Sequence, residues 1–231
     1  MSLRVAFDLD GTVADMHAAM ARVAADMFGA AEGSGEGSQN GTNGEAEAEL
    51  PSLGDLNLTA RQQAQLWDAV RQIENFWMGL PETEPGIIGR IAQTAAARRW
   101  EVIFITTRPS TAGDTTQVQS LRWLAAHGFT LPSCYVVHGS RGKVAEALTL
   151  DAVVDDRPEN CLDVAVESKA KSILVWTADP KGVPPGAARI GVKVAQSIDE
   201  AVSLLEQLDD LRRDRGVVGS IRKMFKRSPS R

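Results

Sequence analysis

The chain of 231 residues has only two cysteines and no long apolar run. Cys134 and Cys161 are too few for a disulfide framework, and each lies beside an apolar run, so we expect buried free thiols. No stretch approaches the roughly 20 apolar residues of a membrane-spanning helix, and the first residues, MSLRVAFDLD, lack the layout of a signal peptide. From these absences we expect a cytoplasmic protein.

Charge is distributed unevenly along a chain of otherwise ordinary globular composition. The whole chain has a net charge of -5, yet residues 212–231 contain eight Arg or Lys and one acid, which gives that segment +7. We therefore distinguish a basic C-terminal tail, residues 213–231. Two interpretations stay open for it: a frayed, solvated end, or a basic amphipathic helix in weak contact with an anionic surface. We expect no stable nucleic-acid complex, and the sequence leaves the oligomeric state open.

Apolar runs and helical patterns alternate from residue 86 onward, which is typical of an α/β protein. Strands are expected at residues 3–7, 101–106, 134–137, 150–156 and 172–176. Helices are expected at residues 15–29, 58–77, 86–100, 115–128, 142–148, 157–170 and 198–214. This order predicts an open, mostly parallel sheet with helices on both faces.

Polar residues stand directly after several of these predicted strands. In open parallel sheets ligands bind at the carboxyl ends of the strands, so such residues meet at one edge. The set comprises Asp8 and Asp10, Thr106 and Thr107, Asp155 and Asp156, and Arg141 and Lys143 from the loop after the strand at 134–137. Three or more carboxylates, two hydroxyls and a cation are thereby expected at one site.

This combination is suited to phosphoryl transfer through a covalent intermediate. Asp8 can attack phosphorus, and Asp10 can protonate the leaving oxygen and then activate water. A hard cation, Mg²⁺, would be held by Asp8, Asp10, Asp155 and Asp156. Lys143 would offset the remaining negative charge, and Thr106 or Thr107 would donate a hydrogen bond to the phosphate. Gly11 permits the sharp exit from the first strand.

These segments resemble the haloacid dehalogenase superfamily of phosphohydrolases. The matching motifs are DLDGT (8–12), IFITT (103–107), Lys143 and VVDD (153–156), in the order of that family. A narrower resemblance links the chain to the 5'(3')-deoxyribonucleotidases. It rests on DDRPEN (155–160), GKVAEAL (142–148) and NFWMGLPETEPG (75–86). The resemblance implies a Rossmann-like sheet with a small helical cap inserted after the first strand.

The resemblance also divides the chain into regions. Residues 1–14 and 86–212 would form the core domain, and residues 15–85 the helical cap. Residues 31–50 are rich in Gly, Ser, Asn and Glu without periodicity, so we expect a flexible insertion within the cap.

Two interpretations stay open for each of three side chains, Phe76, Trp77 and Arg108. Phe76 and Trp77 would stack on or cover a substrate by the resemblance, whereas aromatic residues on a helix usually pack in the core. Arg108 is either a phosphate contact or a solvated loop residue. The histidines His17, His127 and His138 lack metal-ligand spacing and are expected to be structural.

Taken together, these observations predict a Mg²⁺-dependent phosphomonoester hydrolase that resembles 5'-nucleotidases and acts on a small phosphorylated metabolite. A phosphatase for sugar phosphates or another small molecule is the alternative within the enzymes. A non-catalytic protein that binds phosphate or a partner is the alternative outside them. The presence of both Asp8 and Asp10 favours an enzyme, because degenerate relatives tend to lose one of them.

Overall fold

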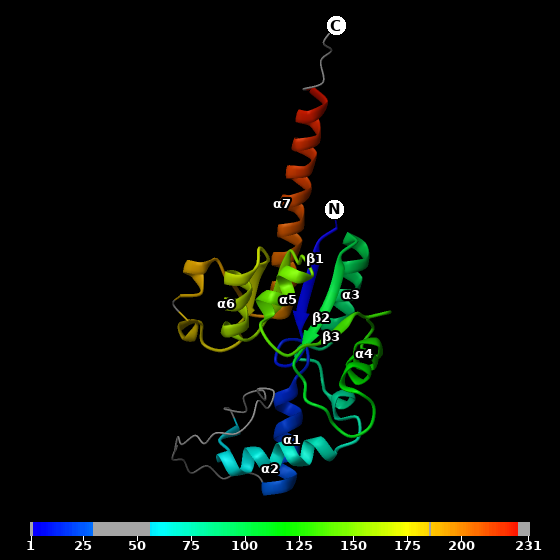
Figure 1. Cartoon of the computed structure of the whole chain (residues 1–231), viewed down its shortest axis with the longest axis vertical. Coiled ribbons are helices and arrows are strands. Elements are labelled where there is room, and N and C mark those ends of the chain that lie inside the picture. The colour runs from blue at the N-terminus through cyan, green and yellow to red at the C-terminus, as the bar shows by residue number, and fades with distance from the viewer. Residues whose placement is uncertain (1, 30–55, 185, 226–231) are drawn as a thin grey trace.

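The computed structural model describes residues 2–29, 56–184 and 186–225 and contains a six-stranded parallel sheet of order β3-β2-β1-β4-β5-β6 (Figure 1). The strands are β1 Arg4–Asp8, β2 Glu101–Thr106, β3 Cys134–Val136, β4 Ala152–Asp155, β5 Lys171–Val175 and β6 Lys193–Ala195. This confirms the predicted α/β class with a parallel sheet. The strand β6 is missing from the prediction because its three residues, KVA, begin with a lysine and form no apolar run.

Helices and 3-10 turns connect the strands. The helices are α1 Met16–Phe28, α2 Ala60–Gln72, α3 Ile87–Arg98, α4 Thr116–Ala126, α5 Arg141–Ala147, α6 Pro158–Glu167 and α7 Ile198–Phe225. The 3-10 turns are η2 Phe76–Gly79, η3 Pro180–Gly182 and η4 Ala188–Ile190. Local chemistry explains several starts: Thr59 forms a capping box with Gln62 at α2, and Pro158 occupies the first turn of α6.

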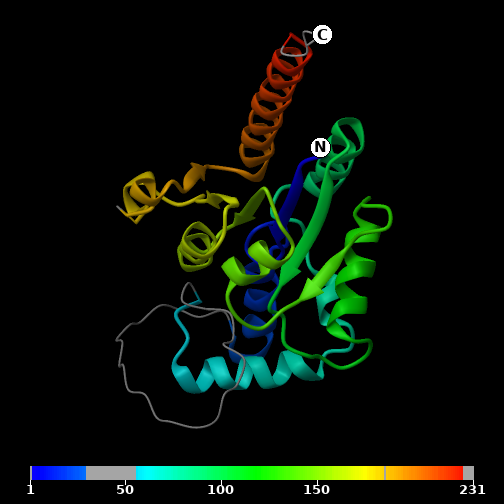
Figure 2. The same cartoon turned by 45° about the horizontal axis from the view of Figure 1, so that its top comes forward.

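The two faces of the sheet are covered by different helices because successive side chains of a strand point to opposite faces. Val5 and Phe7 of β1 belong to a core cluster that includes residues of α3, α4 and α7. Ala6 belongs to a second cluster, with residues of α5 and α6. Figure 2 shows α5 and α6 on one side of the strands and α4 on the other. The predicted coverage of both faces is confirmed.

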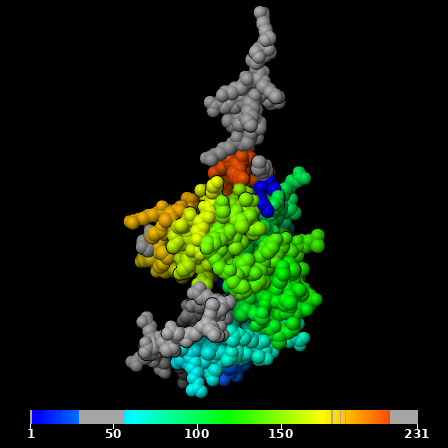
Figure 3. Space-filling model, in the orientation of Figure 1, coloured from blue at the N-terminus to red at the C-terminus, as the bar shows by residue number. Residues whose placement is uncertain are grey.

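A helical insertion follows β1, as the sequence predicts. Helices α1 and α2 pack against each other at the end of the sheet towards which β1 points (Figure 1). The surface view shows α2, in cyan, at the opposite end of the molecule from the base of α7, in orange (Figure 3). The predicted flexible segment, residues 31–50, lies outside the described residues.

The end of α2 differs from the prediction of one helix over residues 58–77. Helix α2 ends at Gln72, and Asn75 adopts a left-handed backbone with φ 54°. The backbone N–H of Asn75 donates to the carbonyl of Ala112 at 2.8 Å, and its side chain accepts from the N–H of Asp114 at 2.9 Å. These tertiary hydrogen bonds replace the helical ones, and helical periodicity alone does not reveal them.

Helix α7 crosses the predicted boundary of the basic tail without interruption. Its first turns pack on the sheet through Ile198, Ala201, Val202 and Leu205, which are all buried. The helix then continues beyond residue 213 to Phe225 and extends away from the body of the molecule (Figures 1 and 2). Among the described helices, none combines the length and apolar character required to cross a membrane. Cys134 and Cys161 are buried free thiols, as predicted.

Candidate active site

Three carboxylates gather where β1 and β4 end. These strands are neighbours in the sheet, so Asp8 at the end of β1 meets Asp155 at the end of β4, with Asp156 following. One oxygen of each of the three carboxylates lies within 4.8 Å of the others, and Asp8 and Asp155 are buried. This donor set fits a divalent cation, which prefers carboxylate oxygens.

The turn after β1 is shaped by Gly11. Its φ is +87°, a backbone conformation that residues other than glycine rarely adopt. A Cβ at this position would lie 2.3 Å from Oδ2 of Asp156. The next residue, Thr12, donates from its hydroxyl to Oδ1 of Asp156 at 2.9 Å. The Gly-Thr pair after the opening aspartates therefore both makes room for the third carboxylate and orients it.

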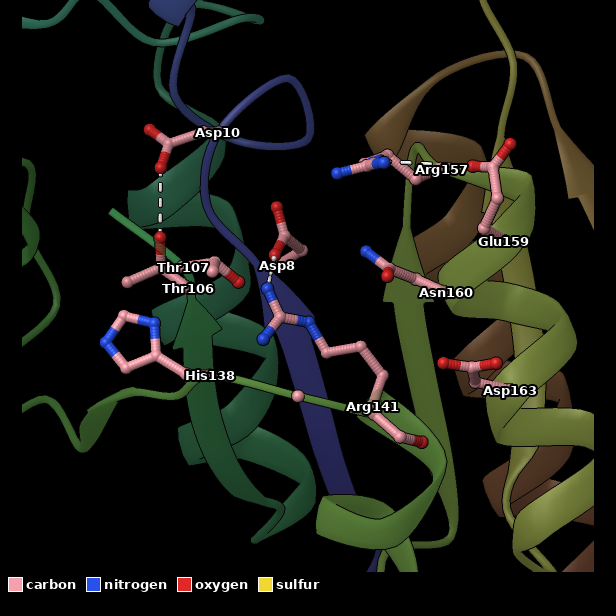
Figure 4. A pocket seen from close by; sticks show the side chains of 12 residues that line it. Asp8, Asp10, Thr106, Thr107, His138, Arg141, Arg157, Glu159, Asn160 and Asp163 are labelled. Atoms are coloured by element: carbon pink, nitrogen blue, oxygen red, sulfur yellow. Dashed lines mark hydrogen bonds and ion pairs between the residues drawn. The ribbon is translucent and has the colours of Figure 1, made fainter. Parts of the chain in front are cut away.

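Arg141 supplies the positive charge of the cluster. It stands at the first position of α5, which Ser140 caps, and its Nη2 donates to Oδ1 of Asp8 at 2.8 Å. Its Nε lies 3.8 Å from Oδ2 of Asp155. Arg141 is 4% exposed, yet its Nε and Nη1 have no hydrogen-bond partner in the part of the chain that the structure describes. Figure 4 shows this side chain reaching across the pocket to Asp8.

Lys143, the cation that the motif comparison selects, is not brought into the cluster. It lies two residues further along α5 and is exposed, and it does not line the pocket described below. Two residues on a helix are about 200° apart, so only one of Arg141 and Lys143 can face the carboxylates. In this structure that residue is Arg141.

The surroundings of the cluster raise the pKa of its carboxyl groups. Burial, followed by the negative charge of Asp156, raises the pKa of Asp155 to about 7, although Arg141 acts in the opposite direction. Burial and the charge of Asp155 raise the pKa of Asp8 well above its ordinary value. Burial likewise raises the pKa of Asp156. The cluster is short of positive charge, which a bound divalent cation would supply.

Asp10 does not belong to this group of three carboxylates, and its side chain points away from Asp8 towards Thr106 (Figure 4). Its Oδ2 accepts from the Thr106 hydroxyl at 2.9 Å and from Nε of Arg108 at 2.8 Å, and its Oδ1 accepts from Nη2 of Arg108 at 2.8 Å. The structure therefore separates Asp10 from the metal-binding group in which the sequence places it. Asp10 nevertheless lines the pocket, within reach of a bound ligand.

Arg108 is neither a solvated loop residue nor a lining residue of the pocket. It is buried, and its remaining nitrogen, Nη1, donates to the hydroxyl of Ser120 at 2.9 Å. All three of its nitrogens are thus bound by protein groups. The expected contact between Arg108 and substrate has no support in this geometry, because the cation is used to bind Asp10.

Phe76 and Trp77 pack in the hydrophobic core. Trp77 is fully buried, its Nε1 donates to the carbonyl of Pro109 at 3.0 Å, and the two rings meet edge to face. Neither ring lines the pocket. Of the two readings of this pair, the structure places both rings in the core and gives no support to a contact with substrate.

A pocket of about 440 Å³ opens over Asp8. It is lined by Asp8, Asp10, Thr106, Thr107, His138, Gly139, Ser140, Arg141, Arg157, Glu159, Asn160 and Asp163. Sequence reasoning did not assign His138 and the residues of α6 to the site, although both follow strand ends. Asn160 donates to both oxygens of Asp155, at 3.0 and 3.1 Å, and so orients that carboxylate.

No family model matches the chain, and no curated protein matches its sequence. Solved structures resemble it along most of its length. They include a candidate β-phosphoglucomutase from Thermotoga maritima, with 15% identity, a TM-score of 0.49, and coverage of 89% of this chain and 99% of that one. A hydrolase from Pseudomonas syringae has 15% identity, a TM-score of 0.47, and coverage of 90% and 99%. A haloacid dehalogenase-like hydrolase from Xanthomonas campestris has 14% identity, a TM-score of 0.47, and coverage of 91% and 97%. Likenesses this distant carry no argument about family or activity, so the function must be inferred from the site.

Proposed function

We propose that the protein is a Mg²⁺-dependent phosphomonoester hydrolase that uses Asp8 as its nucleophile. The observation that carries the proposal is the buried cluster of Asp8, Asp155 and Asp156 with Arg141. Two nitrogens of Arg141, Nε and Nη1, are buried without a hydrogen-bond partner among the described residues, and a guanidinium beside Asp8 suits the oxygens of a phosphate. Carboxylates, a cation site and an unsatisfied guanidinium together suit a ligand that carries a phosphoryl group.

The residues present fit a bound Mg²⁺. Asp8, Asp155 and Asp156 would hold it. Burial is the main cause of their raised pKa values, and neighbouring carboxylates raise those of Asp8 and Asp155 further, a repulsion that a cation would relieve. When bound, the cation neutralises this charge and polarises a phosphate oxygen.

The reaction then follows from the placement of the side chains. A carboxylate oxygen of Asp8 attacks phosphorus as the bond from phosphorus to the ester oxygen breaks, and Asp10 gives that oxygen a proton. Asp10 next takes a proton from water, which attacks the phosphoryl group, releases phosphate and regenerates Asp8. Arg141 would stabilise the phosphoryl oxygens throughout. Thr107, which lines the pocket, is the better hydroxyl donor, because the Thr106 hydroxyl is bound to Asp10.

We infer that the substrate is a small, polar phosphate ester. Beyond the cluster the pocket is lined by Arg157, Glu159, Asn160 and Asp163, which can hydrogen-bond hydroxyl or amide groups. A nucleoside monophosphate is the substrate suggested by the resemblance to nucleotidases. A sugar phosphate is the alternative favoured by this polar lining, since no Phe, Tyr or Trp is found among the described residues that line the pocket, and His138 is the one ring there.

The proposal is tested by phosphate release from p-nitrophenyl phosphate by the full chain, with Mg²⁺ and with EDTA. We expect turnover with Mg²⁺ alone, and loss of at least about 10³-fold in Asp8→Asn, because an amide cannot form the covalent intermediate. Asp26→Asn is the matched control, since Asp26 is exposed on α1. A panel of nucleotides and sugar phosphates then ranks the substrates. Activity that persists in EDTA or in Asp8→Asn would contradict the proposal, and no activity on any ester would favour a phosphate-binding protein.

A further inference from the structure

Arg108 is a buried cation beside the pocket, and its side-chain hydrogen bonds go to the protein groups of Asp10 and Ser120. The residue is 1% exposed, and its Nε and Nη2 donate to both oxygens of Asp10 at 2.8–3.0 Å. A guanidinium that binds a carboxylate with two nitrogens fixes the plane of that carboxylate as well as its position. The orientation of Asp10 is therefore set mainly by Arg108, with one further hydrogen bond from Thr106.

Arg108 is itself held from several directions. Its guanidinium carbon lies 4.9 Å from the centre of the Trp77 ring and 6.0 Å from that of Trp123. Both rings are anchored, since Trp77 donates to the carbonyl of Pro109 and Trp123 to that of Leu80. Ring faces attract a guanidinium, most strongly where water is excluded, so these contacts help to hold Arg108 in place. The side chain of Arg108 has little freedom to move.

The backbone that follows Arg108 is also fixed. Asp114 donates its N–H to Oδ1 of Asn75 at 2.9 Å, and Asn75 donates its own to Ala112 at 2.8 Å. A Cβ on Gly113 would lie 2.5 Å from the same Oδ1 of Asn75, so the two segments are in close contact. The loop between β2 and α4 is thereby tied to the segment that leaves the helical insertion.

We propose that Arg108 is the positioning residue of Asp10. It holds this carboxyl group where the group can protonate the leaving oxygen and later activate water, and it does not touch the substrate itself. The inference rests on the proposed function, which assigns Asp10 its acid–base role. Displacement of a reacting group by about 1 Å lowers a rate roughly 100-fold. Loss of Arg108 should therefore slow those steps in which Asp10 moves a proton.

The test compares Arg108→Met with wild type on two esters, p-nitrophenyl phosphate and an alkyl phosphate with a poor leaving group. We expect the steady-state kcat for the alkyl ester to fall about 100-fold with KM nearly unchanged. The nitrophenolate leaving group needs little protonation, so phosphorylation of Asp8 should stay within about threefold of wild type. Hydrolysis of the intermediate should lag, which gives a burst of one nitrophenol per enzyme and an adduct on Asp8 in quenched samples.

Two further variants separate positioning from folding. Arg108→Lys keeps the positive charge but offers Asp10 one nitrogen in place of two. We therefore expect partial recovery of activity relative to Arg108→Met, with a kcat roughly tenfold below wild type. Arg122→Met removes an exposed arginine from α4 and should behave as wild type. A merely structural role for Arg108 would lower the burst amplitude and both substrates' rates equally. If Arg108→Met does not fold, Arg108→Lys carries the comparison.

A double-mutant cycle with Asp10→Asn gives the decisive result. If Arg108 acts through Asp10, adding Arg108→Met or Arg108→Lys to Asp10→Asn should lower kcat no further. An equal loss in both backgrounds would overturn the inference while leaving the proposed function intact. An inactive wild type would overturn both. The inference is supported if Arg108→Met or Arg108→Lys lowers kcat only in the chain that retains Asp10, and if the burst is observed.

Discussion

At the scale of single residues, the site contains buried carboxylates whose mutual repulsion lowers the stability of the fold. Asp8, Asp155 and Asp156 face one another with a single guanidinium, that of Arg141, among them. Asp10, in contrast, has a complete set of partners in Arg108 and Thr106. Two aspartates that stand one residue apart in the sequence therefore have opposite relations to the fold. The first is tolerated for its chemistry, whereas the second balances a buried cation.

Neutralising these two aspartates should change stability in opposite directions. In EDTA at neutral pH we expect Asp8→Asn to raise the free energy of unfolding by about 1 kcal/mol, because it relieves repulsion within the cluster. Asp10→Asn should lower it by about 3 kcal/mol, because Arg108 is left without a counter-charge in a buried site. Urea unfolding followed by tryptophan fluorescence measures both. A destabilised Asp8→Asn would show that the cluster is not strained.

The raised pKa of Asp155 predicts the pH dependence of the metal-free protein. A folded-state pKa of about 7 means that, between roughly pH 4 and 7, the folded chain binds a proton that the unfolded chain has released. This contribution to stability is therefore present at low pH and is lost as pH rises towards 7. In EDTA, the stability of wild type relative to Asp155→Asn should fall from pH 5 to pH 8.

Adding Mg²⁺ is the control for this titration. Mg²⁺ binds the deprotonated carboxylates, so its stabilising effect should grow over the same range of pH. A difference between wild type and Asp155→Asn that is constant from pH 5 to pH 8 would mean that Asp155 does not titrate in this window.

At the scale of elements, the turn between β1 and α1 decides the shape of the site. Its backbone reverses at Gly11, which brings Thr12 to Asp156 and leaves Asp10 on the side of Thr106 and Arg108. The parallel pairing of β1 with both β2 and β4 places this turn between the two strand ends that carry the other site residues. This turn thus places Asp8 and Asp10 in two separate environments.

Gly11→Ala should damage the metal site as well as the backbone. The left-handed φ strains any side chain by about 1–3 kcal/mol, and the new Cβ would displace Asp156 from the cluster. We expect Mg²⁺ affinity, measured by calorimetry, to fall about tenfold or more. Gly86→Ala is the matched control, because Gly86 has φ +80° with nothing within 4 Å of a Cβ. Gly86→Ala should have the same backbone strain but bind Mg²⁺ as tightly as wild type. If Gly11→Ala and Gly86→Ala bound Mg²⁺ with equal affinity, the role of Gly11 would be disproved.

At the scale of the whole molecule, the packed body and the basic C-terminal extension are separate features. The first turns of α7 are integrated into the core, and Asp209 accepts a hydrogen bond from the ring of Trp100 at 3.0 Å. The helix continues from there to Phe225 and extends away from the sheet (Figure 1). The described part of the basic tail, residues 213–225, therefore extends away from the strand ends at which we place the reaction.

We propose that this extension mediates weak binding to anionic surfaces, and truncation tests it. Removal of residues 215–231 should abolish co-sedimentation with phosphatidylserine vesicles at low salt and leave phosphatase turnover unchanged. Neutral phosphatidylcholine vesicles are the control for nonspecific sedimentation. No binding of the full chain at low salt, where attraction is greatest, would disprove a surface role for the tail.

Much of the fold and of the chemistry is readable from the sequence alone. Apolar runs that end in Asp8 and Asp155 predict buried strands with carboxylates at their ends, and the alternation of strands with helices predicts a parallel sheet. Because parallel strands bring like ends together, the sequence by itself predicts that these carboxylates meet. The cap of α2 at Thr59 and the buried state of the two cysteines follow from equally local rules.

Only the tertiary structure decided which neighbours the other polar side chains have. The sequence predicts Lys143 as the cation of the site, whereas the rotation of α5 about its axis places Arg141 against the carboxylates and leaves Lys143 exposed. Trp77 is buried, and Arg108 binds Asp10 instead of a ligand, because the loop after β2 packs against the segment that leaves α2. Such pairings depend on distances between segments far apart in the chain, and local periodicity carries no information about them.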